Sequence, residues 1–378
     1  MKVLTIGTDR KLFEEKSPVL DRALVYASLV EEIHIIVCTT RKHNLVYKNV
    51  GNLHIHPTNS ISRWFYIWSV YQLGKKVIPK FNFVRGLSVI TTQDPFESGF
   101  SGFLLSRKYR LPLYLQSHTD FLSSNFKESF LNRVRLVLAR FVIPRAQGMR
   151  AVSSVVKDSI LNRFKKLKYN IDILPVFVDV KKINEVVPDP KVLEMLSKFK
   201  FVVCMVSRLT KEKNVDLALE ALHPIIKNNP YVGLVVVGDG NQKKSLQNLS
   251  KKLEIQNNVL FVGWREDVVS FYKSSQMFLN TSSYEGYGMS IIEAASSNIP
   301  VVTTQVGIAK EICKDGINAS VCPVGDIGCI SKAVSDLISD NSKRQLYVNN
   351  MKETLSEFVE NMESYSKKYI NDLEKLIK

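Results

Sequence analysis

The 378-residue sequence is poor in cysteine, in acidic side chains and in long apolar runs. Its five cysteines are scattered without a Cys-x-x-Cys pair, which favours reduced structural thiols over a disulfide framework or a structural zinc site. The longest stretch without charge, residues 294–309, is shorter and more polar than the ~20 apolar residues of a membrane-spanning helix. The first apolar run is interrupted at Asp9, before the core of a signal peptide could form. We therefore expect a globular cytoplasmic protein.

The shortage of acidic residues is confined to the first half. The whole sequence has 52 Lys and Arg against 36 Asp and Glu, a net charge of +16. Residues 1–180 contribute 27 − 13 = +14, which leaves 25 − 23 = +2 for the remainder. Such asymmetry predicts two domains with different surfaces, the first of which faces an anionic partner.

Both halves alternate short β-branched runs with amphipathic stretches, which is typical of parallel sheets covered by helices. We expect an α/β fold with two Rossmann-like domains at residues 1–180 and 191–356. Residues 175–190, rich in proline and charge, are the expected linker. Residues 357–378 predict an amphipathic helix that packs back on the first domain. The expected strands are 3–7, 33–38, 53–57, 89–92, 113–115, 148–152 and 171–174, then 199–206, 232–237, 259–262, 277–279, 301–303 and 319–321.

The most informative segment is residues 282–293. A predicted strand leads into a turn containing Gly286 and Gly288, and a helix begins near Met289. Helix-terminal N–H groups suit a phosphate, and the turn supplies the backbone of Tyr287, Gly288, Met289 and Ser290. Carboxylates would repel a phosphate, so Glu285 and Glu293 are better placed to accept hydrogen bonds from sugar hydroxyls. The alternative is an acidic helix start that binds nothing.

A second anion site is predicted after the strand 199–206. Arg208 and Lys213 flank another helix start, where two cations could stabilise the charge on a leaving diphosphate. A solvated basic loop is the alternative. Its position after the first strand of an α/β sheet favours ligand binding.

Together these motifs resemble the GT-B glycosyltransferases of family 4, a retaining group. The resemblance comprises the Arg208/Lys213 pair, the Val-Gly-Asp-Gly turn at 237–240, the Phe-Val-Gly at 261–263 and the E-x7-E of Glu285 and Glu293. It implies two domains facing across a cleft, with a nucleotide-sugar donor bound mainly by the second. By the resemblance, Glu293 holds the ribose and Glu285 the donor sugar, while Ser207, Arg208 and Lys213 lie at the diphosphate. Ser207 and Asn214 stand where the family commonly has glycine.

The resemblance extends less closely to the first half. Gly7 follows the first strand, like the family's loop near the donor phosphate. His118 resembles the family's cleft histidine, which implies contact with the donor sugar at the anomeric carbon. Asp94 and Asp120 follow predicted strands and could orient an acceptor hydroxyl, although a turn or a helix cap explains either equally well.

A metal requirement is not expected. The sequence contains no Asp-x-Asp, which fits a transferase that neutralises the leaving diphosphate with cations and helix ends. His54 and His56 alternate on a predicted strand, but no third metal ligand is evident and a surface position is favoured. We expect no metal ion and no cofactor apart from the donor substrate.

Two segments of the first half combine cations with large apolar residues. Residues 61–85 interleave tryptophan and tyrosine with lysine, and residues 126–150 place five arginines, up to Arg150, among Leu, Val and Phe. This pattern suits an anionic membrane surface, at ~1 kcal/mol for each cation near the lipid. Aromatics in the core with cations in solvent are the alternative. The absence of an RNA-binding motif argues against nucleic acid as a partner.

The sequence thus favours a retaining glycosyltransferase that moves a sugar from a UDP- or GDP-sugar to a membrane-associated glycan or glycolipid acceptor. Front-face displacement is the expected mechanism, and the retention of configuration follows from the family resemblance. A nucleotide-sugar epimerase or phosphorylase of the same fold is the alternative among enzymes. A non-catalytic basic protein that binds membrane or RNA is the alternative of another class.

Overall fold

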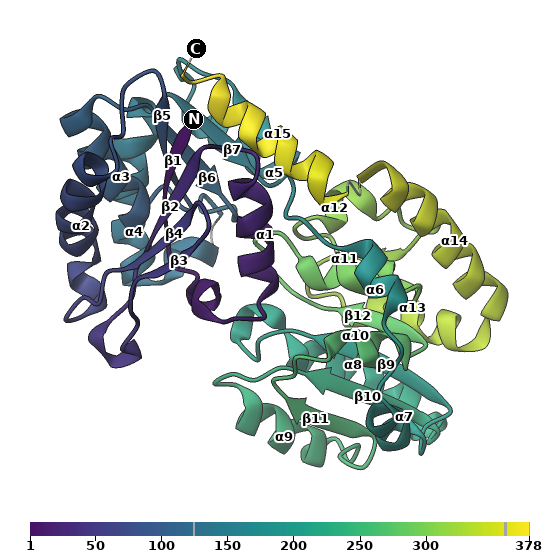
Figure 1. The fold of residues 1–378 in the computed structure, drawn as a ribbon. Helices are drawn as coiled ribbons and strands as arrows, with labels where there is room; N and C mark the ends of the chain where they lie inside the picture. Colours follow the sequence, from purple (N-terminus) through teal and green to yellow (C-terminus); the bar gives the residue numbers. More distant parts are fainter. Residues whose placement is uncertain (124, 359–360, 378) are drawn as a thin grey trace. The chain divides into compact units, whose positions relative to one another are not determined.

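The computed structural model describes residues 1–123, 125–358 and 361–377, and the chain divides into two compact units (Figure 1). The first unit comprises Met1–Phe177 together with Glu360–Lys378, and the second comprises Val178–Val359. The chain therefore passes twice between the units. We call them the first and the second domain.

The first domain is built on an eight-stranded sheet with the order β3-β4-β2-β1-β5-β6-β7-β8. Only β3 is antiparallel to its neighbour. From β1 the strands run outward through β2 and β4 on one side, and through β5, β6, β7 and β8 on the other. The direction of winding therefore reverses between β1 and β5. Its strands are β1 (Lys2–Gly7), β2 (Glu32–Val37), β3 (Lys48–Val50), β4 (Leu53–Pro57), β5 (Ser88–Thr92), β6 (Leu113–Ser117), β7 (Gly148–Ala151) and β8 (Ile171–Ile173).

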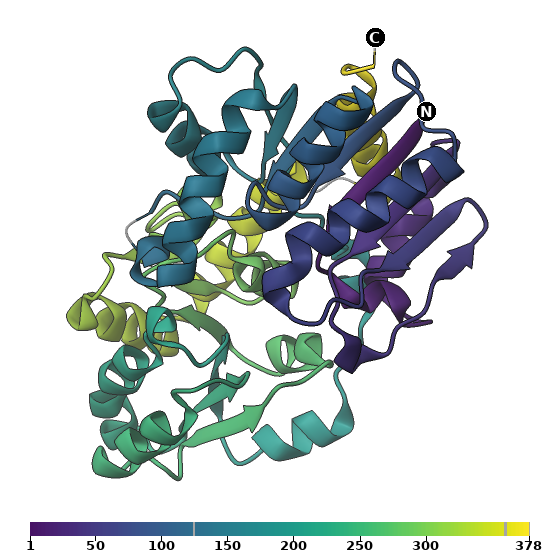
Figure 2. The ribbon, with the colours of Figure 1, turned by 90° about the vertical axis from the view of Figure 1, so that its left-hand side faces the viewer.

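One layer of the first domain is formed by three helices, with α3 packed between α2 and α4, and this layer faces the viewer in Figure 2. Gly74 permits the close approach of α2 to α3, because a Cβ there would lie 2.4 Å from Leu105 Cδ1. On another side of the sheet α1 packs against α15. The helices are α1 (Pro18–Ala27), α2 (Tyr66–Lys80), α3 (Glu97–Tyr109), α4 (Phe130–Val142), α5 (Ser154–Arg163) and α15 (Met362–Glu374).

The C-terminal helix α15 is part of the first domain's core. Tyr365, Tyr369, Ile370 and Leu373 are buried with residues of β1, β2 and α1. The Asn361 side chain caps the helix by accepting from the Ser364 N–H at 2.7 Å. The sequence placed the start of this helix at 357. The structure has a separate helix up to Phe358 and begins α15 at Met362, while residues 359, 360 and 378 of the expected helix lie outside the described residues.

The second domain has a six-stranded parallel sheet with the order β11-β10-β9-β12-β13-β14. This is the doubly wound Rossmann order, which reverses between β9 and β12. All six residues of β10 are buried, and three of them are consecutive valines. A parallel strand covered on both faces is apolar on both, so β10 has no polar face. The strands are β9 (Phe201–Val206), β10 (Val232–Val237), β11 (Val259–Gly263), β12 (Met277–Asn280), β13 (Val301–Thr304) and β14 (Ser320–Cys322).

Helices cover this second sheet and fill the expected linker. The segment that the sequence assigned to a linker contains α6, which packs on α11, so it is part of the second domain. The helices are α6 (Val180–Glu185), α7 (Pro190–Leu196), α8 (Val215–Asn228), α9 (Lys243–Lys252), α10 (Val268–Lys273), α11 (Met289–Ser296), α12 (Ala309–Ile312), α13 (Ile327–Ser339) and α14 (Asn341–Phe358).

The cysteines differ from the sequence expectation. Cys322 at the end of β14 and Cys329 in the first turn of α13 form a disulfide, with their Cα atoms 5.8 Å apart. The strand-to-helix turn brings them together, which their seven-residue separation did not reveal. The expectation of five reduced thiols was therefore wrong for these two, and Cys38, Cys204 and Cys313 are free.

Among the described residues, no helix combines the length and the apolar character needed to cross a bilayer.

Candidate active site

Two loops meet where the strand order of the second domain reverses. One loop follows β9 and the other follows β12, and both leave the carboxyl edge of adjacent strands. Thr281 Oγ1 donates to the carbonyl oxygens of Lys213 at 3.1 Å and Asn214 at 2.8 Å, and the Ser283 N–H donates to Glu212 O at 2.8 Å. These hydrogen bonds hold the predicted diphosphate loop and the predicted sugar loop together as one unit.

The centre of this unit is an ion pair between Lys213 and Glu285. Lys213 Nζ lies 2.6 Å from Glu285 Oε2, and the two side chains are only 11% and 10% exposed. Ser282 Oγ lies 2.7 Å from the other carboxylate oxygen, Oε1. The carboxylate is thereby fixed in orientation, and one positive and one negative group are held in a water-poor position where electrostatic effects are strong.

Arg208 lies at the outer side of the same loop. Its side chain is 74% exposed and contacts Glu212 at 3.3 Å. The structure thus brings Lys213 and Glu285 into contact but leaves Arg208 at the surface, free to change rotamer. Within the described part of the chain, the buried Ser207 Oγ has no hydrogen-bond partner. An orphaned hydroxyl in the loop that also carries Arg208 and Lys213 is compatible with an anionic ligand.

Ser207 and Asn214, which stand where the resembled family commonly has glycine, differ in backbone conformation and in packing. Asn214 precedes α8 with φ 46°, a left-handed conformation that asparagine tolerates better than most residues other than glycine. Ser207 packs against the adjacent turn, where a Cβ on Gly238 would lie 1.9 Å from Ser207 O. The loop therefore keeps its tight course without glycine at either position.

The turn before α11 depends on its own glycines. Gly288, at φ 97°, directly precedes the helix, and the Ile308 N–H donates to Tyr287 O at 2.6 Å. The N–H groups of Met289 and Ser290 lie in the first turn, where no preceding helical carbonyl can accept from them. Gly286 lies in the same turn, between Glu285 and Tyr287. The segment can therefore present backbone donors to an anion.

Glu293 occupies the second turn of α11, in an environment unlike that of Glu285. Tyr272 of α10 donates to Glu293 Oε2 at 3.2 Å. Burial raises the pKa of Glu293, and the Tyr272 hydrogen bond partly offsets this rise. Oε2 of the carboxyl group is thus held by a hydrogen bond from Tyr272. In the described part of the chain Oε1 can form a hydrogen bond with a hydroxyl of a ligand.

The expected first-domain residues lie at the carboxyl edge of its own sheet. Gly7 ends β1, where a Cβ would lie 2.1 Å from Gln93 Oε1, and the same oxygen accepts from the Thr8 N–H at 3.2 Å. His118 follows β6. Burial lowers the pKa of His118 to about 3, and the charges of Arg150 and Arg22 add to the effect, so this imidazole is neutral at pH 7.

Asp94 and Asp120 both stabilise turns. Asp94 Oδ1 accepts from the Phe96 N–H at 2.7 Å, and burial raises the pKa of its carboxyl group. Asp120 Oδ1 accepts from the Leu122 N–H at 3.2 Å and from Ser159 Oγ at 2.7 Å. Hydrogen bonds of this kind within a turn were the alternative that the sequence analysis gave to acceptor binding by these two residues.

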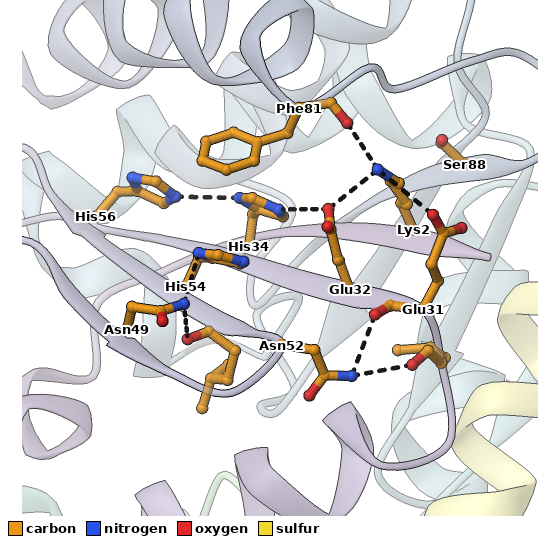
Figure 3. Close-up of polar contacts among 12 residues, drawn as sticks. Lys2, Glu31, Glu32, His34, Asn49, Asn52, His54, His56, Phe81 and Ser88 are labelled. Carbon is orange, nitrogen blue, oxygen red and sulfur yellow. Dashed lines mark hydrogen bonds and ion pairs between the residues drawn. The ribbon is translucent and has the colours of Figure 1, made fainter.

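The strand histidines are buried in a cluster rather than placed at the surface (Figure 3). His56 and His34, on β4 and β2, are joined by a 3.2 Å hydrogen bond, and His34 also contacts Glu32 at 3.2 Å. Burial lowers the pKa of His34 to about 4 and that of His56 to about 3. The surface expectation was therefore wrong for His56.

This cluster also contains a group of three possible metal ligands, which includes His54 but not His56. Glu32, His34 and His54 each present a ligand atom, all within 4.8 Å of one another. Lys2 Nζ, however, lies 3.1 Å from Glu32 Oε2, so a cation already holds the carboxylate that a metal ion would need. The cluster is better described as a hydrogen-bonded network that ties β1, β2 and β4 together.

Residues 194–354 match the family described as Glycosyl transferases group 1, and the match contains the predicted donor-site residues of the second domain. The second domain is thus similar to this glycosyltransferase family over most of its length. Across its full length the chain has the GT-B fold, since it aligns over 100% of both chains with HepE of Anabaena, solved in complex with UDP and glucose, at TM-score 0.77 and 18% identity. Sucrose-phosphate synthase of Thermosynechococcus elongatus aligns over 98% of both chains, at TM-score 0.79 and 16% identity.

Relatives of this chain include one enzyme named as the synthase of a glycolipid and one named for a lipid-linked sugar. Alpha-monoglucosyldiacylglycerol synthase of Streptococcus pneumoniae is 27% identical over 57% of this chain and 51% of that protein. The UDP-Gal:alpha-D-GlcNAc-diphosphoundecaprenol alpha-1,3-galactosyltransferase of Escherichia coli is 25% identical over 72% of this chain and 70% of that protein. The chain spans about half the length of the first curated relatives that it matches.

Proposed function

We propose that this protein is a retaining glycosyltransferase that moves a sugar from a UDP- or GDP-sugar to a membrane-associated glycan or glycolipid. The observation that carries the proposal is the partly buried Lys213–Glu285 pair, held at the carboxyl edge of the second sheet. The UDP-bound state of HepE and the glycolipid and lipid-linked sugar in the names of two relatives support the same substrate classes.

Each donor-site residue has a proposed role. Lys213 and Arg208 neutralise the diphosphate, with the Ser207 hydroxyl and the first N–H groups of α11 as further donors. Glu285 accepts from hydroxyls of the donor sugar, and Glu293 binds the ribose. The neutral His118 supplies a hydrogen bond near the anomeric carbon. The loop that begins at Gly7 lies near the donor phosphate, while Asp94 and Asp120 border the acceptor.

Front-face displacement is the proposed reaction. The bond between the anomeric carbon and the diphosphate oxygen breaks, and the acceptor oxygen bonds to the same face of that carbon. The acceptor proton passes to the departing diphosphate oxygen, so no protein base is required. Lys213 stabilises the negative charge as it develops, an effect typically larger than that of any proton transfer. We propose that this cation, with Arg208, takes the place of a divalent ion.

Docking on an anionic membrane is proposed for the layer of α2 and α4. Trp64 and Trp68 are 67% and 61% exposed, and Phe130 is 77% exposed. On α4 the exposed apolar positions 130, 134, 137 and 141 recur at helical spacing and form one stripe. Arg145 stacks on Phe141 with its guanidinium carbon 3.9 Å from the ring centre. Exposed aromatic and cationic groups together favour the interface of an anionic leaflet at the cytoplasmic face.

One member of the predicted basic surface does not belong to it. The sequence grouped Arg150 with the arginines of residues 126–150, but Arg150 is only 6% exposed and lies on β7 beneath α15. Arg135 is held by Glu97 at 2.9 Å. The remaining cations of α4 are therefore the ones available for lipid.

The test is a panel of nucleotides and nucleotide sugars. Binding of UDP or GDP should raise the melting temperature by mass action, and adenosine or cytidine diphosphates should not. Donor turnover should depend on added lipid-linked acceptor. Consumption of donor without acceptor would favour the epimerase, and no response to any nucleotide would favour the non-catalytic alternative.

A further inference from the structure

The first domain contains a small cavity in which His118 is the only one of the proposed donor contacts among the lining residues that the structure describes. It has a volume of about 110 Å³ and lies between α1, the sheet and α15. Its polar wall includes Arg22, Gln116, His118 and Arg150. Among the described residues, no aspartate or glutamate lines it. The cavity is therefore positively charged without a carboxylate of its own.

Arg150 is the most unusual residue of this wall. It is 6% exposed, its Nε donates to Gln116 Oε1 at 3.1 Å, and its Nη1 contacts the Tyr365 hydroxyl at 3.3 Å. The guanidinium also stacks on the Tyr369 ring, with 4.8 Å between the guanidinium carbon and the ring centre. Of the five guanidinium hydrogens, these two bonds use two. Within the described chain no ion pair balances this buried charge, a situation that is unfavourable unless a counter-ion enters.

The neighbouring acids are engaged elsewhere. Asp172, beside Arg150 in the sheet register, accepts from the Tyr114 hydroxyl at 3.0 Å. Asp94 is held by the N–H of Phe96. Neither forms an ion pair with Arg150 in the described structure, so the charge of this guanidinium is available to a ligand.

Arg22 and His118 make the cavity a site for an anion. Arg22 projects from α1, and no ion pair or hydrogen bond of its guanidinium is present among the residues that the structure describes. The positive charges of Arg22 and Arg150 both act on the His118 ring, so all three groups share one small space. A neutral imidazole can donate one hydrogen bond, and two guanidinium groups can donate in the paired geometry that phosphate and carboxylate accept.

We propose that this cavity binds a single anionic group, a phosphate or a carboxylate, and that the group is a substituent of the acceptor. The volume is large enough for such a group. Gln93 and His118 reach the cavity from the carboxyl ends of β5 and β6, the edge at which ligands of such sheets bind. The acceptor is thereby assigned to the acidic saccharides or phosphate-linked glycans. The assignment of the anion to the acceptor rests on the proposed transferase function, whereas anion binding itself does not.

A purely structural role for Arg150 would be to hold α15, through Tyr365 and Tyr369. Arg22 distinguishes this structural role from anion binding. It lines the cavity, and in the described structure it forms no hydrogen bond to α15. The variants are therefore Arg22→Gln and Arg150→Gln. The control is Arg163→Gln, which removes an exposed arginine at the end of α5.

The experiment follows the His118 ring by NMR in the full-length protein, which has only six histidines. Inorganic phosphate, acetate and, as a neutral probe, glucose are titrated at pH 7 with UDP present, which keeps the probes from the donor site. We expect a saturable shift of the His118 signal with phosphate or acetate but not with glucose. Affinity should fall about tenfold or more in Arg22→Gln and remain unchanged in Arg163→Gln.

Three outcomes overturn the proposal: no shift with either anion, an equal shift with sodium chloride at matched ionic strength, or an unchanged affinity in Arg22→Gln. If anion affinity falls in Arg150→Gln but not in Arg22→Gln, Arg150 has only the structural role, and the third of these outcomes applies. Glucuronate and glucose 6-phosphate then test the acceptor assignment, since one of them should bind about tenfold more tightly than the bare anion. Equal affinities refute that assignment. UDP binding, measured separately by calorimetry, reports on the proposed function without involving this cavity.

Discussion

At the scale of single residues, the Lys213–Glu285 pair is the feature on which the donor site depends. The two residues are 72 positions apart in the sequence, and each belongs to a different loop of the second sheet. With side chains about one-tenth exposed, neither charge is well screened by water. Removing one partner leaves the other partly buried without its counter-charge.

Replacing either residue should impair transfer by orders of magnitude, and the unpaired charge left behind should also lower stability without abolishing the fold. We expect Glu285→Ala and Lys213→Ala to lower turnover by about 100-fold or more, because a preorganised charge near the reacting bond is lost. Arg208→Ala should have a smaller effect on stability, since its side chain is exposed. Steady-state turnover and circular dichroism measure the two properties.

The control for this prediction is Glu254→Ala. This variant breaks the Lys227–Glu254 pair, whose side chains are 43% and 75% exposed, elsewhere in the second domain. Turnover close to that of the wild type in Glu285→Ala would contradict the role assigned to the carboxylate.

Glu285 and Glu293 were predicted as site residues from a motif within one strand-turn-helix unit, and Arg208 was predicted from the loop after β9. The contact partners of these residues could not be predicted in the same way. Lys213 on Glu285 and Tyr272 on Glu293 are long-range contacts set by strand order. Arg150 was misassigned for a related reason: a cation near apolar residues has the same local pattern on a surface helix and in a buried strand.

At the scale of elements, the alternation of strands and helices predicted both sheets, because buried parallel strands are continuous apolar runs. The element boundaries were less accurate. The proline-rich segment after Phe177 was expected to be a linker and contains α6, since a six-residue helix gives too little periodicity to detect. The short strand β3 was missed for the same reason.

The histidine cluster links β2 and β4 in a pH-dependent way. The pKa values of His34 and His56, about 4 and 3, lie below the ordinary value near 6.5. Between the lowered pKa values and the ordinary value near 6.5, the unfolded chain binds protons that the folded domain does not. The free energy of unfolding therefore falls as the pH decreases from 7 to 5. We expect a loss of about 2 kcal/mol per histidine at pH 5, measured as a lower melting temperature.

Replacing one of these histidines tests the origin of this slope. In His34→Gln the dependence of the melting temperature on pH should be shallower, whatever the variant's stability at pH 7. His223→Gln, which removes a histidine from α8 of the second domain, serves as the matched variant and should keep the slope. An unchanged slope in His34→Gln would exclude the cluster as its source.

At the scale of the whole molecule, charge and exposed aromatics are concentrated on the first domain. The net charge of residues 1–180 is +14 of the total +16, by the counts of 27 against 13 and 52 against 36. Charge counting predicted this asymmetry from the sequence. It could not predict that Trp64 and Trp68 are exposed, since the same aromatic spacing is compatible with a core helix.

Membrane docking makes a salt-dependent prediction. The protein should sediment with vesicles containing anionic lipid at low salt and much less in about 0.5 M salt, where exposed charges are screened within about 4 Å. The double variant Trp64→Ser/Trp68→Ser should bind about tenfold more weakly at low salt. Trp264→Ser removes a similarly exposed tryptophan, 64% exposed, from the second domain and should bind like the wild type. Equal sedimentation with neutral vesicles would contradict the electrostatic part of the proposal.

The two crossings of the chain between its domains have a consequence for biosynthesis. Val178–Val359 forms a continuous insertion within the first domain, whose core is completed only by Tyr365, Tyr369, Ile370 and Leu373. As the polypeptide emerges from the ribosome, the second domain can fold while the earlier-made part of the first domain still lacks α15. The first domain can thus complete its core only after the second has been synthesised, and it remains open to chaperones until Met362–Glu374 has emerged.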